Sequence, residues 1–377
     1  MQADSMINPG TVRKIAVLRA NGIGDYILSL PALDALRLRF PAAEIVLLGQ
    51  RWHSDYLTGR PGPVDRVVEL PTARGVTAPA DADEDAQELA SFLGAMRREA
   101  FDLAFQLHDA GRWSNAFIQQ LGARHTFGPR SPDAAALDFS VLYIDYQPET
   151  FRYIEVVALA GARPAGWEAR IAVTQADHVA ARPYLPAAQP LVVLHVGASD
   201  SRRRWPIANF AAVGDALVEA GAVVAVEAID DERLLLDVLK ERMHSPFIDL
   251  GADCTLSRLT GVLANAALIV ANDSGPLHLA HAVGTASVGI YWSGNLINAG
   301  AGSRSRHRPL ISWRVTCPEC GANTTQRGCT HVASFVADVP PDEVIRETLG
   351  LLRSETAPPR KDCRPAGLGV RSSCFSS

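Results

Sequence analysis

The chain has 377 residues, of which 47% are hydrophobic and 20% are charged, and its net charge is -5. This length predicts two domains, and the slightly acidic balance excludes general binding to nucleic acid. No apolar run reaches the roughly 18–20 residues of a membrane span, the N-terminus lacks a signal-peptide core, and the six cysteines lack the spacing of a secreted disulfide framework, so we expect a soluble cytoplasmic protein.

The first half alternates between expected strands and helices. Residues 1–12 are expected to form a disordered leader, and residues 13–175 a Rossmann-like domain. The expected elements are strands at 14–19, 44–48, 66–70 and 102–107, and helices at 26–40, 81–100 and 112–121. Such alternation predicts a parallel, doubly wound sheet.

The alternation restarts after an alanine- and proline-rich stretch. Residues 176–190 are expected to be a linker, 191–353 a second Rossmann-like domain and 354–377 a disordered tail. The expected strands are 191–195, 222–228, 247–250, 268–271 and 286–290, and the expected helices are 207–220, 231–242, 256–265 and 341–352. Two such α/β halves place a ligand between them, outside the carboxyl ends of the strands.

A glycine-containing loop follows the first expected strand. Asn21, Gly22 and Gly24 lie in it, and Asp25 stands at the entrance of the next helix. Asp25 is either a helix N-cap or a general base that points into the cleft. A dinucleotide fingerprint has little support because Ile27 occupies the position of its third glycine.

A second loop follows the strand at 191–195. Its small residues, among them Ser199, would let the backbone approach a phosphate, and Arg203 stands within a run of arginines. The alternative is a solvated basic loop.

The segment 268–278 is the most informative in the chain. The apolar strand 268–271 breaks at Asn272, Asp273, Ser274 and Gly275, and Pro276 then opens a helix. A helix N-terminus presents backbone N–H groups and a positive dipole end, so we expect an anion to bind there.

Two histidines lie on this helix. His278 is one turn inside the expected anion site, whereas His281 is expected to pack against the sheet. Metal binding by the two has little support because no third ligand is evident.

Cysteines gather before the last expected helix. Cys317 and Cys320 form a Cys-x-x-Cys pair, and Cys329 and His331 follow as Cys-x-His. This spacing suits a structural zinc site, and the alternative is a group of free cytoplasmic cysteines.

Taken together, these residues resemble glycosyltransferase family 9, the ADP-heptose:lipopolysaccharide heptosyltransferases. The resemblance spans most of the chain. It rests on the order of these segments: 15–19, 24–25, 30–33, 101–107, 203–206, 272–278 and the cysteine cluster.

The resemblance implies a GT-B fold whose first domain binds the acceptor and whose second binds a nucleotide-sugar. It implies an inverting transfer of heptose, without metal or other cofactor, from ADP-L-glycero-D-manno-heptose to the lipopolysaccharide inner core. Asp25 is implied to be the base. The implied donor-binding residues are Arg203 at the diphosphate, Asp273 at the sugar, and Ser274, Gly275 and His278 at the phosphate-binding turn and helix.

Two departures leave the sugar and nucleotide open. Arg203 stands where the family commonly has lysine, and Glu227 adds bulk in the segment 226–231, where the family usually has a glycine-rich turn ending in an acid. The rival hypotheses are a nucleotide-sugar epimerase on a similar scaffold and a non-catalytic sugar-nucleotide-binding protein. A lipid-linked oligosaccharide acceptor would bring the protein to the inner face of the inner membrane, with peripheral association through its arginines and final helix.

Overall fold

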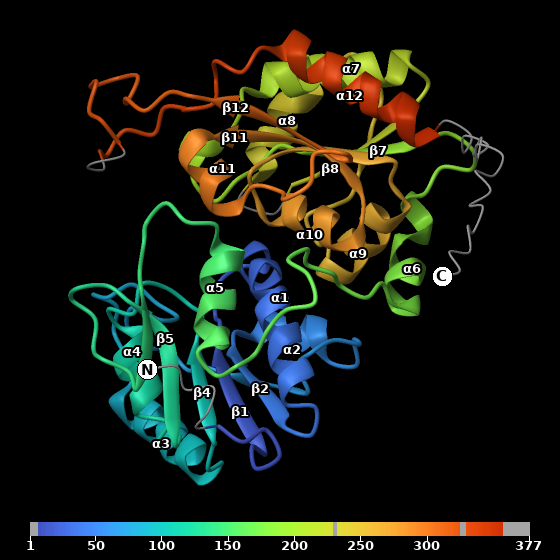
Figure 1. The fold of residues 1–377 in the computed structure, drawn as a ribbon. Coiled ribbons are helices and arrows are strands. Elements are labelled where there is room, and N and C mark those ends of the chain that lie inside the picture. Colours follow the sequence, from blue (N-terminus) through green and yellow to red (C-terminus); the bar gives the residue numbers. More distant parts are fainter. Residues whose placement is uncertain (1–6, 229–231, 325–328, 357–377) are drawn as a thin grey trace, which may run out of the picture.

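The protein is described by a computed structural model that covers residues 7–228, 232–324 and 329–356. Two α/β halves lie one above the other, each built on a sheet with helices on its faces (Figure 1). Both sheets are parallel and six-stranded within the described residues. The α/β class with two Rossmann-like sheets is therefore confirmed.

The first sheet has the order β3-β2-β1-β4-β5-β6. Its strands are β1 (Lys14–Leu18), β2 (Glu44–Gly49), β3 (Arg66–Glu69), β4 (Leu103–Gln106), β5 (His125–Arg130) and β6 (Phe139–Leu142). Its helices are α1 (Ile23–Arg39), α2 (Arg51–Leu57), α3 (Ala86–Arg98), α4 (Ser114–Gln119) and α5 (Glu149–Ala158). The central strands β1 and β4 are mostly apolar and are buried along almost their whole length, as expected for strands with helices on both faces.

The second sheet has the order β12-β11-β10-β7-β8-β9. Its strands are β7 (Leu191–His195), β8 (Val223–Glu227), β9 (Ile248–Asp249), β10 (Leu268–Asn272), β11 (Ala286–Trp292) and β12 (His307–Ser312). Its helices are α7 (Ile207–Glu219), α8 (Arg233–Arg242), α9 (Leu256–Asn265), α10 (Gly275–Val283), α11 (Ser293–Ala299) and α12 (Pro341–Thr356).

The structure differs from the expected boundaries at both ends of the chain and between the halves. Ile7 and Val12 are buried, so the packed chain begins before residue 13. The stretch 176–190 is not merely a connection: it holds most of α6 (Gln175–Ala181), whose capping box begins at Thr174. At the other end α12 extends to Thr356, beyond the expected boundary at 353. Residues 1–6 and 357–377 lie outside the described residues.

The start of two helices also differs from expectation. Helix α3 begins at Ala86 and not at residue 81, because the Asp85 carboxylate accepts hydrogen bonds from the N–H groups of Gln87 and Glu88. Helix α1 begins at Ile23 and not at residue 26. Asp25 therefore lies inside the first turn of α1.

The two halves are joined by a buried ion pair. Arg60, after α2, binds both carboxylate oxygens of Asp177 on α6 at 2.6 and 2.8 Å, and the Asp177 side chain is fully buried. Burial alone would raise the pKa of Asp177, but the hydrogen bonds from Arg60 and Ser257 outweigh it and lower this pKa to about 2. Nearby, the Tyr56 hydroxyl lies 2.7 Å from that of Thr260.

We expect Asp177→Asn to lower the free energy of unfolding by about 3–5 kcal/mol, because it leaves the buried Arg60 charge uncompensated. The carboxylate has a depressed pKa, so its stabilisation is complete above the ordinary value of 3.8 and is lost as pH falls through about 2. Urea unfolding of both proteins across this pH range checks the prediction. Asp55→Asn, in an ion pair whose side chains are both largely exposed, is the control and should change stability little. The prediction would be contradicted if the difference in unfolding free energy between wild type and Asp177→Asn stayed constant down to the lowest pH.

Candidate functional site

The predicted site residues lie where each sheet changes its direction of winding. In the first sheet this occurs between β1 and β4, and in the second between β10 and β7. The loops after such strands diverge and leave room for a ligand at the carboxyl edge. Helices α1 and α10, which begin at these edges, face each other between the two halves (Figure 1).

Asp25 is the third residue of α1, and Gly22 is its N-cap. The Asp25 Oδ2 atom accepts a hydrogen bond from the Gly22 N–H at 3.2 Å, and its Oδ1 lies 3.2 Å from Arg19 Nη2. The side chain is 47% exposed. The N-cap interpretation is therefore wrong, because Gly22 is the N-cap. Asp25 lies in the first turn of the helix and accepts the Gly22 N–H, and its carboxylate remains accessible.

Arg19 was not predicted as a site residue, although it directly follows β1 and begins the loop that leads to Asp25. Its buried guanidinium donates hydrogen bonds to the carbonyl oxygens of Leu107, His108 and Asp25 at 2.8 to 3.0 Å. Burial opposes this charge, but the neighbouring Tyr153 and Asp25 hold the pKa of Arg19 above its usual value. Arg19 thus fixes the position of the Asp25 carboxylate.

His108, two residues after the end of β4, lies on the other side of the same switch point. Its Nδ1 accepts a hydrogen bond from the Ala20 N–H at 3.3 Å. Burial, followed by the charge of Arg19, lowers the pKa of His108 to about 4. The imidazole is therefore neutral near pH 7, and it helps to order the loop that leads to Asp25. The loop residue Asn21 is half-buried and Gly22 is exposed.

Asp273 is the centre of the cluster in the second half. Its Oδ2 atom accepts hydrogen bonds from Arg203 Nη1 at 3.1 Å and Asn295 Nδ2 at 2.8 Å, and its Oδ1 lies 3.3 Å from His278 Nε2. Burial would raise the pKa of Asp273, but His278, Arg203 and Asn295 together hold it below its ordinary value. The carboxylate thus stays charged and orients the side chains of Arg203, Asn295 and His278. Asn295 was missed because α11 was not predicted.

The loop after β7 contacts the end of β10. Arg203 Nη2 donates to the exposed Ser199 hydroxyl at 2.7 Å, so Arg203 bridges Ser199 and Asp273. Asn272 holds the two segments together: its Oδ1 accepts from the Trp205 N–H and its Nδ2 donates to the Val196 carbonyl, both at 2.9 Å. The structure therefore brings together the two loops that the sequence places far apart.

Helix α10 begins without a side-chain cap. Its N-cap is Ser274, whose hydroxyl donates to the Asn272 carbonyl at 3.0 Å instead of accepting from the helix. Gly275 is the first helical residue and Pro276 follows it in the first turn. Backbone N–H groups at this terminus are thus not occupied by a side-chain cap, which suits an anion. His281 instead lies 2.9 Å from the Ser287 hydroxyl of β11, which confirms its packing against the sheet.

The starts of α1 and α10 touch. A Cβ atom at Gly24 would lie 2.8 Å from His278 Cδ2 and 3.4 Å from Gly275 Cα, and one at Gly275 would lie 2.7 Å from Ile23 Cγ2. Only glycine fits at both positions without movement. Asp25, whose carboxylate is accessible, follows Gly24 in the same turn of α1, so this turn packs against the start of α10.

We expect Gly24→Ala to reduce turnover by about 100-fold while the fold is retained, because a methyl group here separates the two helix starts. Gly94→Ala is the control: it also adds one methyl group to a helix, and its nearest neighbour would be an arginine nitrogen at an ordinary 3.7 Å. Steady-state rates and thermal unfolding of both variants check the prediction. Equal rates for the two variants would show that the close contact has no role in turnover.

A buried histidine–glutamate pair lies at the ends of β7 and β8. His195 Nδ1 lies 2.5 Å from Glu227 Oε2, and both side chains are buried. Burial opposes the charge of His195, but Glu227 raises its pKa above the usual value. Glu232 packs so closely on Gly197 that a Cβ there would lie 1.9 Å from its carboxyl carbon. Glu227 thus faces the interior, and residues 229–231 of the atypical segment lie outside the described residues.

The four residues of the cysteine cluster also come together. One ligand atom from each of Cys317, Cys320, Cys329 and His331 lies within 4.8 Å of all the others. Each described cysteine is free of a disulfide. This cluster is separate from Asp273 and follows β12.

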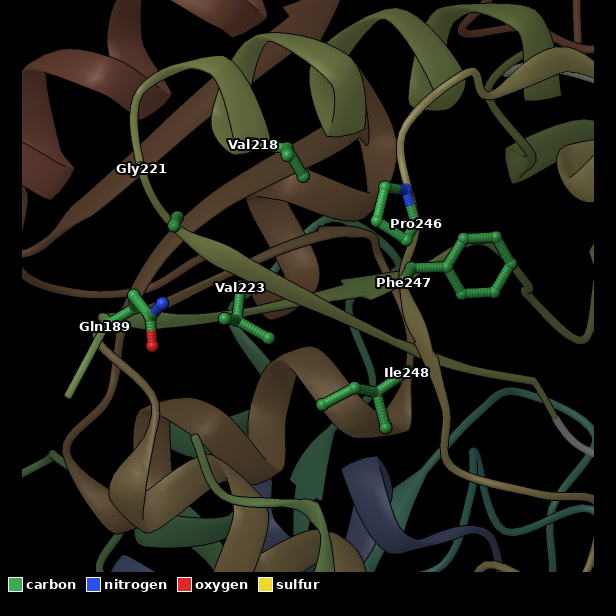
Figure 2. A pocket seen from close by; sticks show the side chains of 8 residues that line it. Gln189, Val218, Gly221, Val223, Pro246, Phe247 and Ile248 are labelled. Carbon is green, nitrogen blue, oxygen red and sulfur yellow. The ribbon is translucent and has the colours of Figure 1, made fainter. Parts of the chain in front are cut away.

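A surface pocket lies at the opposite edge of the second sheet (Figure 2). Gln189 precedes β7, Val223 begins β8 and Ile248 begins β9, so the pocket is at the amino ends of the strands. It is therefore distant from the candidate site. Within the described ranges, no helix has both the length and the apolar character that a membrane crossing requires.

The chain is similar to a known protein family and to several of its members. The profile of glycosyltransferase family 9 (heptosyltransferase) matches residues 89–317. Lipooligosaccharide heptosyltransferase 2 of Haemophilus ducreyi is 23% identical over 289 residues, which cover 72% of this chain and 80% of that protein. Lipopolysaccharide heptosyltransferase 2 of Escherichia coli is 22% identical over 365 residues, covering 91% of this chain and 100% of that protein.

The fold is also that of a solved structure. ADP-heptose LPS heptosyltransferase II of E. coli superposes with a TM-score of 0.73 at 20% identity, over 91% of this chain and 100% of that one. The GT-B arrangement of two parallel sheets expected from the sequence is confirmed.

Proposed function

Because the chain belongs to glycosyltransferase family 9, the heptosyltransferases, we propose that it transfers a heptose from ADP-heptose to the core of lipopolysaccharide or a similar surface glycan. The donor assignment is supported by the E. coli enzyme described as an ADP-heptose heptosyltransferase. The acceptor assignment is supported by relatives described as lipopolysaccharide and lipooligosaccharide heptosyltransferases.

The observation that carries this proposal is the contact between the α1 and α10 N-termini. It brings the turn of α1 that carries the accessible Asp25 carboxylate against the start of α10, and α10 closely follows Asp273, the partner of Arg203. A glycosyl transfer from a sugar diphosphate needs these two features: a group that takes a proton from the acceptor, and positive charge that stabilises the departing diphosphate.

We infer an inverting single displacement. The Asp25 carboxylate takes the proton from the acceptor hydroxyl as its oxygen attacks the anomeric carbon. The bond from that carbon to the diphosphate oxygen breaks on the opposite face, so the configuration inverts. The leaving ADP carries the electron pair, and the N–H groups at the start of α10 with Arg203, which Ser199 and Asp273 orient, stabilise its charge. On this proposal no metal acts on the diphosphate.

Asp273 is assigned to the sugar and not to proton transfer. Its carboxylate is buried and already accepts hydrogen bonds from Arg203 and Asn295. A base must exchange protons with the acceptor, which the more exposed Asp25 is better placed to do. His278 and Gly275 line the same helix start.

Exposed apolar side chains on the first half support the proposal of a lipid-linked acceptor. At the end of β6, between β6 and α5, and on the first turn of α5, large apolar side chains are exposed: Leu142, Ile144, Tyr146 and Phe151. We propose that this rim lies against the inner face of the membrane that holds the acceptor. Sedimentation of the protein with acceptor-containing vesicles, compared with plain vesicles, tests this part of the proposal.

A thermal-shift panel of nucleotide-sugars tests the function as a whole. A ligand that binds only the folded state must raise the melting temperature, so ADP-heptose should raise it more than UDP- or GDP-sugars do. Absence of a shift with every nucleotide-sugar would contradict the proposal. Conversion of the donor without acceptor would indicate an epimerase, and binding without turnover on any core acceptor would indicate a non-catalytic protein.

A further inference from the structure

The cysteine cluster is built on a short hairpin between β12 and α12. This segment projects from the edge of the second half (Figure 1). Thr316 and Asn323 form an antiparallel bridge, and the Thr324 N–H donates to the Val315 carbonyl at 2.9 Å. The hairpin therefore fixes the Cys-x-x-Cys pair at its turn.

The turn itself has the form of a metal-binding loop. The Gly321 N–H donates to the Cys317 carbonyl at 2.9 Å, and Gly321 has a φ of +71°, a conformation that favours glycine. The sulfur atoms of Cys317 and Cys320 lie close enough together for one metal ion to reach both.

The second pair of ligands closes on the first. The ligand atoms of all four residues lie within 4.8 Å of one another. Tetrahedral zinc bonds of about 2.3 Å to sulfur and about 2.0 Å to nitrogen require ligand atoms roughly 3.5 Å apart, so only a small contraction is needed. Among the described residues, His331 Nδ1 is buried and has no hydrogen-bond partner, whereas its Nε2 lies 3.9 Å from Glu319.

We propose that Cys317, Cys320, Cys329 and His331, the last through Nδ1, bind one structural zinc ion. Three thiolates and one imidazole are a donor set that zinc prefers, and four protein ligands leave no open position for chemistry. The ion therefore stabilises a segment of the chain and does not act on substrate.

That segment supports the loop that carries Arg203. Directly after His331, the Ser334 hydroxyl donates to the Arg204 carbonyl at 2.6 Å, and the Phe335 N–H donates to the Arg202 carbonyl at 2.7 Å. The Arg202 guanidinium also lies over the Phe335 ring, 5.9 Å from its centre. By fixing Cys329 and His331, the zinc ion holds residues 332–335 against residues 201–204 and so positions Arg203 for the donor.

Elemental analysis of the full, untagged chain tests the site. Purified under reducing conditions, wild type should retain zinc in a stoichiometric amount, and Cys320→Ser and Cys329→Ser should lose it. Cys254→Ser is the matched control, because it removes a free cysteine outside the cluster and should keep the metal. Cobalt added to metal-free wild type should give the visible spectrum of a tetrahedral thiolate complex.

Three outcomes would overturn the proposal. They are the failure of reduced wild type to take up added zinc, unchanged zinc content in both cluster variants, and iron in place of zinc in the purified protein. If Cys317 and Cys320 form a disulfide and the protein still binds no zinc after that disulfide is reduced, the first of these outcomes has occurred.

The link to Arg203 has its own readout, which rests on the proposed function. Cys329→Ser should weaken ADP binding by about tenfold relative to Cys254→Ser, the size expected for the loss of one charge-assisted contact. If neither the wild type nor any variant binds ADP, the proposed function fails. The zinc content of the proteins still tests the metal site in that case. Equal ADP affinity in zinc-free Cys329→Ser and in Cys254→Ser would overturn the link alone.

Discussion

Asp25→Asn should lower kcat by about 10²–10⁴-fold, because asparagine cannot take the proton from the acceptor hydroxyl. The amide oxygen can still accept the Gly22 N–H, so the first turn of α1 should remain intact. Donor binding should be almost unchanged, since Asp25 belongs to the other half of the cleft. Steady-state transfer rates together with donor-induced thermal shifts separate these two effects.

The control for this variant is Asp85→Asn. Asp85 is also an acid at a helix start in the first half, where asparagine caps equally well, and it lies outside the candidate site. Its transfer rate should equal that of wild type. If Asp25→Asn kept the wild-type rate, Asp25 would not be the base, although the family assignment would stand.

Arg203→Ala should lower kcat by about 10²–10³-fold and weaken donor binding, because it removes the side chain that meets the charge of the leaving diphosphate. It also leaves the buried Asp273 with Asn295 and His278 as its remaining partners. Arg203→Lys should retain part of the rate, since lysine restores the charge but cannot bridge Ser199 and Asp273 in the same geometry.

Arg242→Ala provides the matched control for Arg203→Ala. Arg242 is exposed in the last turn of α8 in the same half, so its loss removes one positive charge without touching the cleft. Its donor affinity and rate should match wild type. Equal donor affinity in Arg203→Ala and Arg242→Ala would remove Arg203 from the donor site.

Elements with regular patterning could be predicted from the sequence. Apolar runs such as Leu191–His195 and Leu268–Asn272 are buried strands in the structure. The strand His125–Arg130 was missed because Gly128 and Pro129 interrupt its apolar pattern. The strand His307–Ser312 contains Pro309, which a parallel sheet accepts here because β12 is an edge strand.

The candidate site was predictable where it follows a strand directly. Arg203 and Asp273 lie after β7 and β10, and the sheet order brings them to 3.1 Å. Arg19 and Asn295 could not be assigned in this way: the first acts through carbonyl groups of a distant loop, and the second lies on a helix without a clear pattern. Contacts of this kind depend on tertiary packing, which periodicity does not encode.

The close approach of the two halves could likewise not be predicted from the sequence. Gly24 and Gly275 each suggested a turn, but their role is to let two helix starts from different halves meet. The bridge through Asp177 depends on α6, which lies in a stretch whose alanine and proline content indicated only a linker.

Acceptor-dependent release of ADP tests the central claim most directly. Purified wild type would be incubated with ADP-heptose, with and without a core acceptor that lacks the heptose, beside Asp25→Asn. The expected result is ADP release only when the acceptor is present, heptose attached to it with inverted anomeric configuration, and loss of both in Asp25→Asn. Conversion of ADP-heptose without acceptor, or no transfer to any core acceptor under conditions where the donor binds, would contradict the account.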